Sequence, residues 1–201
     1  MKTAAKIIST IFHPLIIPTI GLFIIFNTNS YINYAVPKEL KQAILLLTGI
    51  STFVIPFLIS LMFLNKNLIQ SLEMETSKER IFPYAFTIVF YIFTLFMLKK
   101  SPIPPIIFNF VIGATLSVIL AFIINFKWKI SAHMIGIGGL IGALIAVTLL
   151  LEIYILPYII VGFIVAGVLG TSRLILKAHS PTQIYVGFIL GVICQLIVIY
   201  F

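Results

Sequence analysis

The chain has 201 residues, of which 61% are hydrophobic and 9% charged, and its mean hydropathy is +1.22. A soluble domain of this length cannot bury so much apolar surface, so the composition excludes a water-soluble protein and predicts a membrane protein. The net charge of +8 suits anionic lipid headgroups, and we do not expect nucleic acid as a partner. The single cysteine, Cys194, excludes a disulfide framework and a cysteine-based metal site.

Apolar stretches long enough to cross a bilayer follow one another along the whole chain. A crossing helix needs about 20 apolar residues, and the pattern predicts seven, at 6–27, 41–64, 82–98, 103–125, 130–151, 153–171 and 182–200. The third is short, and only Glu152 and its neighbours separate the fifth from the sixth, so six helices is the alternative count. We therefore expect an all-α, polytopic membrane helix bundle that forms a single domain, residues 1–201.

Basic residues are unevenly distributed between the two predicted sides of the membrane. We call face A the side that holds the N-terminus and the loops after the second, fourth and sixth predicted helices. Nine of the 13 basic residues lie there: Lys2, Lys6, Lys66, Lys78, Arg80, Lys127, Lys129, Arg173 and Lys177. The positive-inside rule then makes face A cytoplasmic. If four of these residues bind an anion instead, the remaining charges are nearly balanced and the orientation stays open.

Polar side chains suited to chemistry gather in two segments of face A. One is 172–183, between the sixth and seventh predicted helices, and the other is 131–133, at the start of the fifth. Each contains a histidine beside a helix N-terminus, because Ser180 is a favourable N-cap followed by a proline and Ser131 can cap the fifth helix. Helix N-termini attract anions. Together with the nearby arginines, they predict a cradle for a phosphate.

The segment 172–183 resembles the third signature of the type 2 phosphatidic acid phosphatase (PAP2) superfamily, which reads Ser-Arg, five residues, His, three residues, Asp. Ser172, Arg173 and His179 match it in identity and spacing. The second signature, Pro-Ser-Gly-His, is similar to residues 130–133, and the first, Lys, six residues, Arg-Pro, is loosely similar to residues 78–83. The resemblance implies a PAP2-like six-helix core at 41–201, with 1–40 as an additional N-terminal helix and loop.

This resemblance also implies a function, the hydrolysis of a lipid phosphomonoester or polyprenyl diphosphate. His179 would attack phosphorus and form a phosphohistidine, and His133 would protonate the leaving oxygen. The groups that would hold the phosphate are Arg173, Arg80, Lys78, Ser131 and Ser172. No cofactor and no metal are implied, and the expected partners are the lipid phosphate and the bilayer. We expect a multi-pass protein of the bacterial inner membrane.

Two departures from the signatures leave a second function open. Gln183 stands where the superfamily has Asp, and the chain contains no Asp at all. Gln183 either orients His179 or completes a capping box by reaching back to the Ser180 backbone N–H. Seven residues before Arg80, Glu73 stands where the first signature has Lys. The alternative is a catalytically silent relative that binds or transports a lipid phosphate.

Two further features lie outside the signatures. Four glycines at 136, 138, 139 and 142 favour close packing of the fifth predicted helix against a neighbour. His13, followed by Pro14 and preceding Pro18, indicates a kink in the first predicted helix. We assign His13 no role from the sequence.

Overall fold

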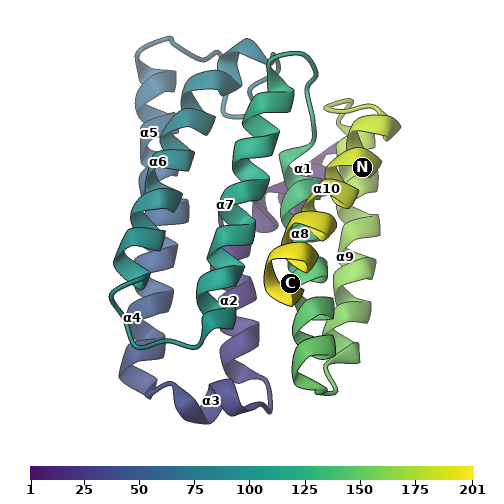
Figure 1. Ribbon diagram of the computed structural model, residues 1–201. Helices are drawn as coiled ribbons and strands as arrows, with labels where there is room; N and C mark the ends of the chain where they lie inside the picture. The colour runs from purple at the N-terminus through teal and green to yellow at the C-terminus, as the bar shows by residue number, and fades with distance from the viewer.

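The computed structural model describes residues 1–201 as an all-helical bundle (Figure 1). Six helical segments are long and apolar enough to cross a membrane. The first joins α4 (Lys38–Gly49) through a π-helical turn (Ile50–Val54) to α5 (Ile55–Asn65), and the others are α6 (Ile81–Leu98), α7 (Pro105–Asn125), α8 (Ala132–Leu151), α9 (Leu156–Ile175) and α10 (Pro181–Tyr200). The predicted fold class, a polytopic membrane helix bundle, is confirmed.

The first predicted helix, 6–27, is wrong as a single crossing. The structure divides it into α1 (Lys2–Ile11) and α2 (Ile17–Asn27), and neither reaches the roughly 20 residues that a crossing needs. Pro14 causes the break, because it lacks an N–H and disfavours helical geometry at the residue before it. The Leu15 N–H donates to His13 Nδ1 at 3.4 Å within the break. Six long helices therefore replace the count of seven.

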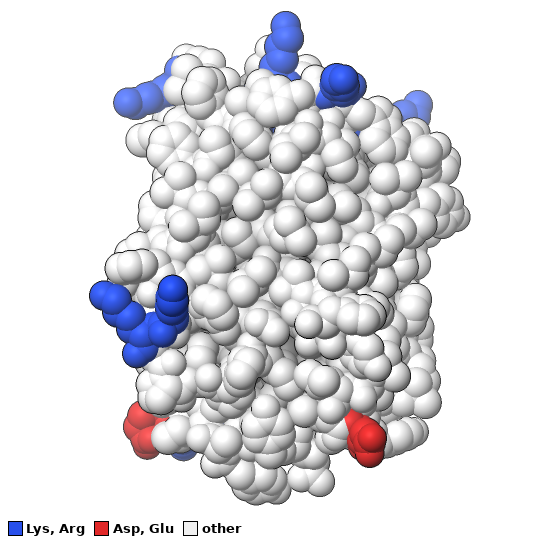
Figure 2. All heavy atoms as spheres, viewed as in Figure 1, with Lys and Arg blue, Asp and Glu red and all other residues white.

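The charged ends of the bundle enclose an apolar middle. The loops 66–77, 126–131 and 176–180 lie together at the upper end in Figure 1, which is face A, whereas the short α3 (Tyr31–Ala35) lies at the lower end. On the side shown in Figure 2, Lys and Arg atoms gather at the upper end, Glu atoms and further Lys or Arg atoms lie in the lower half, and a broad uncharged band lies between the two groups. This pattern fits a protein that spans a bilayer.

Glycines allow α8 and α10 to pack backbone against backbone. A Cβ atom added at Gly138 would lie 2.2 Å from Phe188 O, and one added at Gly142 would lie 2.5 Å from Val192 O. No side chain fits at either position, so the predicted packing role of these glycines is confirmed. The contacts advance in the same direction along both helices, which means that α8 and α10 run parallel. Their N-termini therefore lie side by side at face A.

We expect Gly138→Ala to destabilise the bundle, because the new methyl group would collide with the α10 backbone. Overpacking of this kind costs about 1–3 kcal/mol. Thermal unfolding of the purified protein in detergent should show a lower Tm for this variant. Gly167→Ala is the matched control, since nothing lies within 4 Å of a Cβ at Gly167 and alanine favours the helix. Equal Tm values for the two variants would contradict the packing role.

Candidate functional site

A cavity of about 440 Å³ extends from face A into the bundle. Charged and imidazole side chains line its outer end: Lys6, His13, Glu73, Arg80, His133, Arg173 and His179. Its inner end is mainly apolar and aromatic, with Phe57, Tyr91, Phe110, Val118 and Leu140. His133 and Leu140 both line the cavity and lie about 10 Å apart along α8, at 1.5 Å per helical residue, so the cavity extends at least that far into the bundle. The cavity therefore combines a cationic mouth with an apolar interior.

His179 and Gln183 share a hydrogen-bond network at the N-terminus of α10. Gln183 Oε1 lies 3.1 Å from the Ser180 backbone N and 3.1 Å from His179 Nδ1. A backbone N–H can only donate, so the amide atom facing it is the oxygen, and His179 Nδ1 must donate as well. Ser180 Oγ accepts from the Gln183 N–H at 3.4 Å and completes the capping box. Gln183 thus caps α10 and orients His179 at the same time.

This tautomer leaves the second ring nitrogen of His179 available. Burial lowers the pKa of His179 to about 3, and the positive charges of Arg80 and Arg173 act in the same direction, against the hydrogen bond to Gln183. The ring is therefore neutral at neutral pH, with its proton on Nδ1 and a lone pair on Nε2. The Nε2 atom is buried and has no hydrogen-bond partner. A nucleophilic imidazole needs this state.

Two arginines are buried beside the same cavity without a carboxylate partner. Arg80 is 7% exposed and donates to the Met74 carbonyl from Nε and to the Ile130 carbonyl from Nη1, both at 3.1 Å. Arg173 is 4% exposed, and its Nε has no hydrogen-bond partner. The one ion pair of the structure joins other residues at the surface. Because an unpaired buried charge is costly, the two guanidinium groups favour an anion in the cavity.

The N-terminal segment forms one wall of the cavity and contacts His133. The His133 Nε2 atom lies 3.0 Å from the Ser9 carbonyl oxygen, and because a carbonyl only accepts, Nε2 carries the proton. His13, in the break after α1, packs edge-on against His133 with ring centroids 5.7 Å apart. All three histidines of the chain therefore line one cavity.

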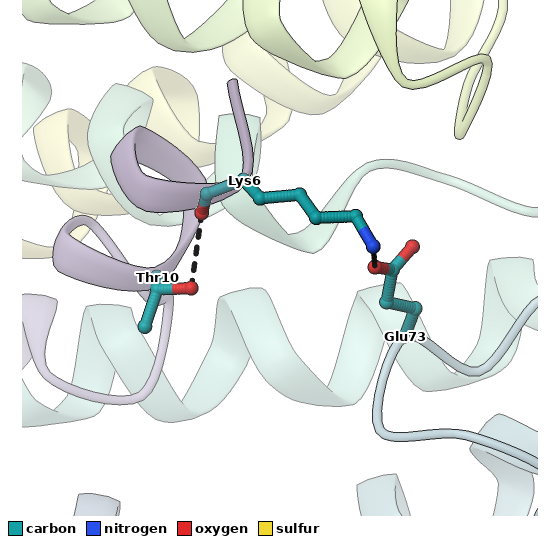
Figure 3. A network of polar contacts seen from close by, with 3 residues as sticks. All are labelled: Lys6, Thr10 and Glu73. Carbon is teal, nitrogen blue, oxygen red and sulfur yellow. Dashed lines mark hydrogen bonds and ion pairs between the residues drawn. The ribbon is translucent and has the colours of Figure 1, made fainter. Parts of the chain in front are cut away.

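A surface ion pair connects α1 to the loop between α5 and α6 (Figure 3). Lys6 Nζ lies 3.8 Å from Glu73 Oε1, and Thr10 Oγ1 donates to the Lys6 carbonyl at 3.0 Å. The two charged side chains are 65% and 47% exposed, so the pair contributes little to stability. Its position shows that α1 reaches the loops of face A.

Three residues that the resemblance assigns to phosphate binding do not line the cavity. Lys78 is exposed, because residues two apart such as Lys78 and Arg80 point to different sides of a helical turn. Ser172 Oγ donates to the Val168 carbonyl of its own helix at 2.8 Å. Ser131 is fully buried, and its Oγ forms no hydrogen bond with the first turn of α8. The cap that we expected from Ser131 is therefore absent.

Sequence reasoning missed the contribution of the N-terminal segment to the site. Lys6, Ser9, Thr10 and His13 all line the cavity. Their spacing of three, four and seven residues places polar groups along one face of a helix. That polar stripe in an otherwise apolar segment was the available signal.

No protein-family model, curated protein or solved structure matches the chain. The resemblance to the PAP2 superfamily therefore rests on the signature residues alone, and the function that it implies stays a prediction. No cluster of three or more His, Cys, Asp or Glu side chains is placed to hold a metal ion.

We expect Gln183→Met to release His179 and weaken the start of α10, because methionine keeps the length of the side chain but removes the acceptor oxygen. Loss of a cap costs about 1 kcal/mol, so the Tm should fall. Nitrogen NMR of histidine-labelled protein should show that His179 loses its single Nδ1–H tautomer. Gln183→Glu retains an acceptor for both donors and is the control. An unchanged tautomer in Gln183→Met would contradict the orienting role.

We expect stability to fall as the pH drops from about 6.5 toward 4. Burial lowers the pKa of His179 to about 3 and that of His13 to about 4, both from a usual value of 6.5. The unfolded chain therefore binds more protons than the folded chain in this range, which favours unfolding. The Tm of His179→Gln should decrease less between pH 7 and pH 5 than that of the wild type. Lys66→Gln, at an exposed position, should retain the wild-type dependence.

Proposed function

We propose that this protein hydrolyses a lipid phosphate at the face A end of its cavity, with His179 as the nucleophile. One observation carries the proposal: the unpartnered Nε2 of a neutral His179 lines the same cavity as two buried arginines that lack carboxylate partners. Arginine forks suit phosphate oxygens and stabilise charge as it develops on them. The substrate is a lipid phosphomonoester or a polyprenyl diphosphate.

The shape of the cavity supports a lipid as the carrier of the phosphate. Its cationic mouth lies at face A, where headgroups lie, and its interior side chains are mainly apolar. An amphiphile matches both parts, since its phosphate meets Arg80 and Arg173 while part of its hydrocarbon lies deeper. A free inorganic phosphate would leave the apolar interior without a role.

The reaction follows from the tautomer of His179. The Nε2 lone pair forms a bond to phosphorus, the bond from phosphorus to the lipid or pyrophosphate oxygen breaks, and a phosphohistidine results. Water then attacks phosphorus, the bond from phosphorus to Nε2 breaks, and the neutral imidazole returns. Of the two protons of the water, one stays on the inorganic phosphate and the other replaces the proton that the leaving oxygen takes up. Gln183 keeps the proton on Nδ1 and so directs the lone pair to Nε2. The resemblance assigns protonation of the leaving oxygen to His133.

A second candidate function is lipid-phosphate binding or transport without hydrolysis. One observation favours it: the partner of His179 is a neutral amide, which cannot stabilise positive charge on the ring as a carboxylate does. In serine proteases the corresponding Asp-to-Asn change lowers kcat by about 10⁴. The two candidates share the cradle and differ only in whether phosphate is released.

We expect the purified protein to release inorganic phosphate from at least one member of a panel containing phosphatidic acid, phosphatidylglycerol phosphate and a polyprenyl diphosphate. His179→Ala should lower the rate by about 10³-fold or more, because removing a nucleophile removes the covalent route. Lys66→Gln, an exposed charge change in the α5–α6 loop, should retain the wild-type rate. Binding of the panel without any release of phosphate would replace hydrolysis with the binding function.

A further inference from the structure

We propose that His13, contributed by the N-terminal segment, donates its Nε2–H to the bound phosphate group and is a third histidine of the site. The inference rests on the proposed function only in that the cavity binds a lipid phosphate. It concerns a residue that lies outside the three signature segments and outside the implied core at 41–201. The resemblance assigns to His133 the donation of a proton to the leaving oxygen. In this inference His13, and not His133, donates a hydrogen bond to the phosphate group.

Backbone geometry determines which nitrogen of His13 carries the proton. The Leu15 N–H donates to His13 Nδ1 at 3.4 Å. A backbone N–H cannot accept, so Nδ1 holds a lone pair and the proton of the neutral ring lies on Nε2. The structure gives this Nε2 no hydrogen-bond acceptor within the chain. His13 therefore offers a free N–H donor at the wall of the cavity.

The ring N–H of His133 already donates a hydrogen bond within the protein. Its Nε2 is 3.0 Å from the Ser9 carbonyl, so the proton of the neutral ring points at the backbone of α1. The bond connects α8 to the N-terminal segment and holds that segment beside the cavity. The edge-on ring contact of 5.7 Å between His13 and His133 belongs to the same junction. His133 is therefore a positioning residue for the wall that carries His13.

The three histidine rings offer different groups to the cavity because their tautomers and hydrogen-bond partners differ. His179 presents a lone pair from Nε2, His13 presents a proton from Nε2, and His133 anchors α1. Burial and the charge of Arg173 lower the pKa of His13 to about 4, so it is a neutral donor at neutral pH. A neutral imidazole can stabilise a developing oxyanion when it is held in place, and removing one such donor typically costs about 10²–10³ in kcat.

A pair of substitutions separates hydrogen-bond donation from packing. The ring of His13 packs beside those of His133 and Phe53. His13→Phe retains an aromatic ring there but has no N–H, whereas His13→Gln retains an N–H donor without the ring. We expect the release of phosphate to fall about 10²-fold in His13→Phe and less than tenfold in His13→Gln, with a similar Tm for both. Wild-type turnover in His13→Phe, or equal losses in two folded variants, would overturn the inference.

Nitrogen NMR tests the assignment without requiring turnover. The chain has only three histidines, so single substitutions assign every signal of histidine-labelled protein. His13 should show a protonated Nε2 whose signal shifts when short-chain phosphatidic acid is added, but not when phosphatidylcholine of the same chain length is added. A protonated Nδ1 on His13, or a phosphate-dependent shift at His133 and none at His13, would overturn the inference. If the wild type binds but never releases phosphate, hydrolysis fails while the role of His13 stands.

Discussion

The parallel contact between α8 and α10 places the polar groups of the site. Glycine at 138 and 142 lets the two backbones approach so closely that even a methyl group does not fit. Because the helices run parallel, their N-termini and the histidines beside them come to the same end of the bundle. The Ser131 N–H also donates to the Gln183 carbonyl at 3.4 Å, which fixes the two helix starts against each other. Backbone packing in the apolar interior thereby aligns residues that are far apart in the sequence.

At the start of α10, one side-chain oxygen belongs both to the helix cap and to the candidate site. Gln183 Oε1 accepts the Ser180 N–H as part of the cap and the His179 Nδ1–H as part of the site. An aspartate at this position would bring a negative charge but a shorter side chain. A glutamine reaches both donors and leaves the ring neutral. The departure from the superfamily signature is thus compatible with a nucleophilic tautomer, and what it lacks is charge stabilisation once the ring becomes cationic.

The electrostatics of the cavity explain why an anion is the expected ligand. Arg80 and Arg173 are both buried, and backbone carbonyls satisfy only part of the hydrogen-bonding capacity of Arg80. Such charges weaken a fold unless a partner compensates them. The N-terminal segment adds Lys6 and a neutral donor, His13, to the same wall. The helix α1, which the signatures do not include, therefore forms part of the cavity wall, and the break between α1 and α2 allows it to reach that wall.

Composition and apolar periodicity were sufficient for the fold class and for the six long helices, since spans of about 20 apolar residues leave few alternatives. The sequence placed Gln183 within reach of both His179 and the Ser180 N–H, because both contacts are local, but it offered them as alternatives, and the structure shows that both form. The junction of Ser9, His13 and His133 was not visible in the sequence, because it joins residues more than 100 positions apart through one backbone carbonyl. The same holds for Lys78 and Ser131, to which the resemblance assigned phosphate binding but whose side chains do not line the cavity. Residue type and spacing predict what a side chain is able to do, whereas the direction in which it points depends on how the helices pack.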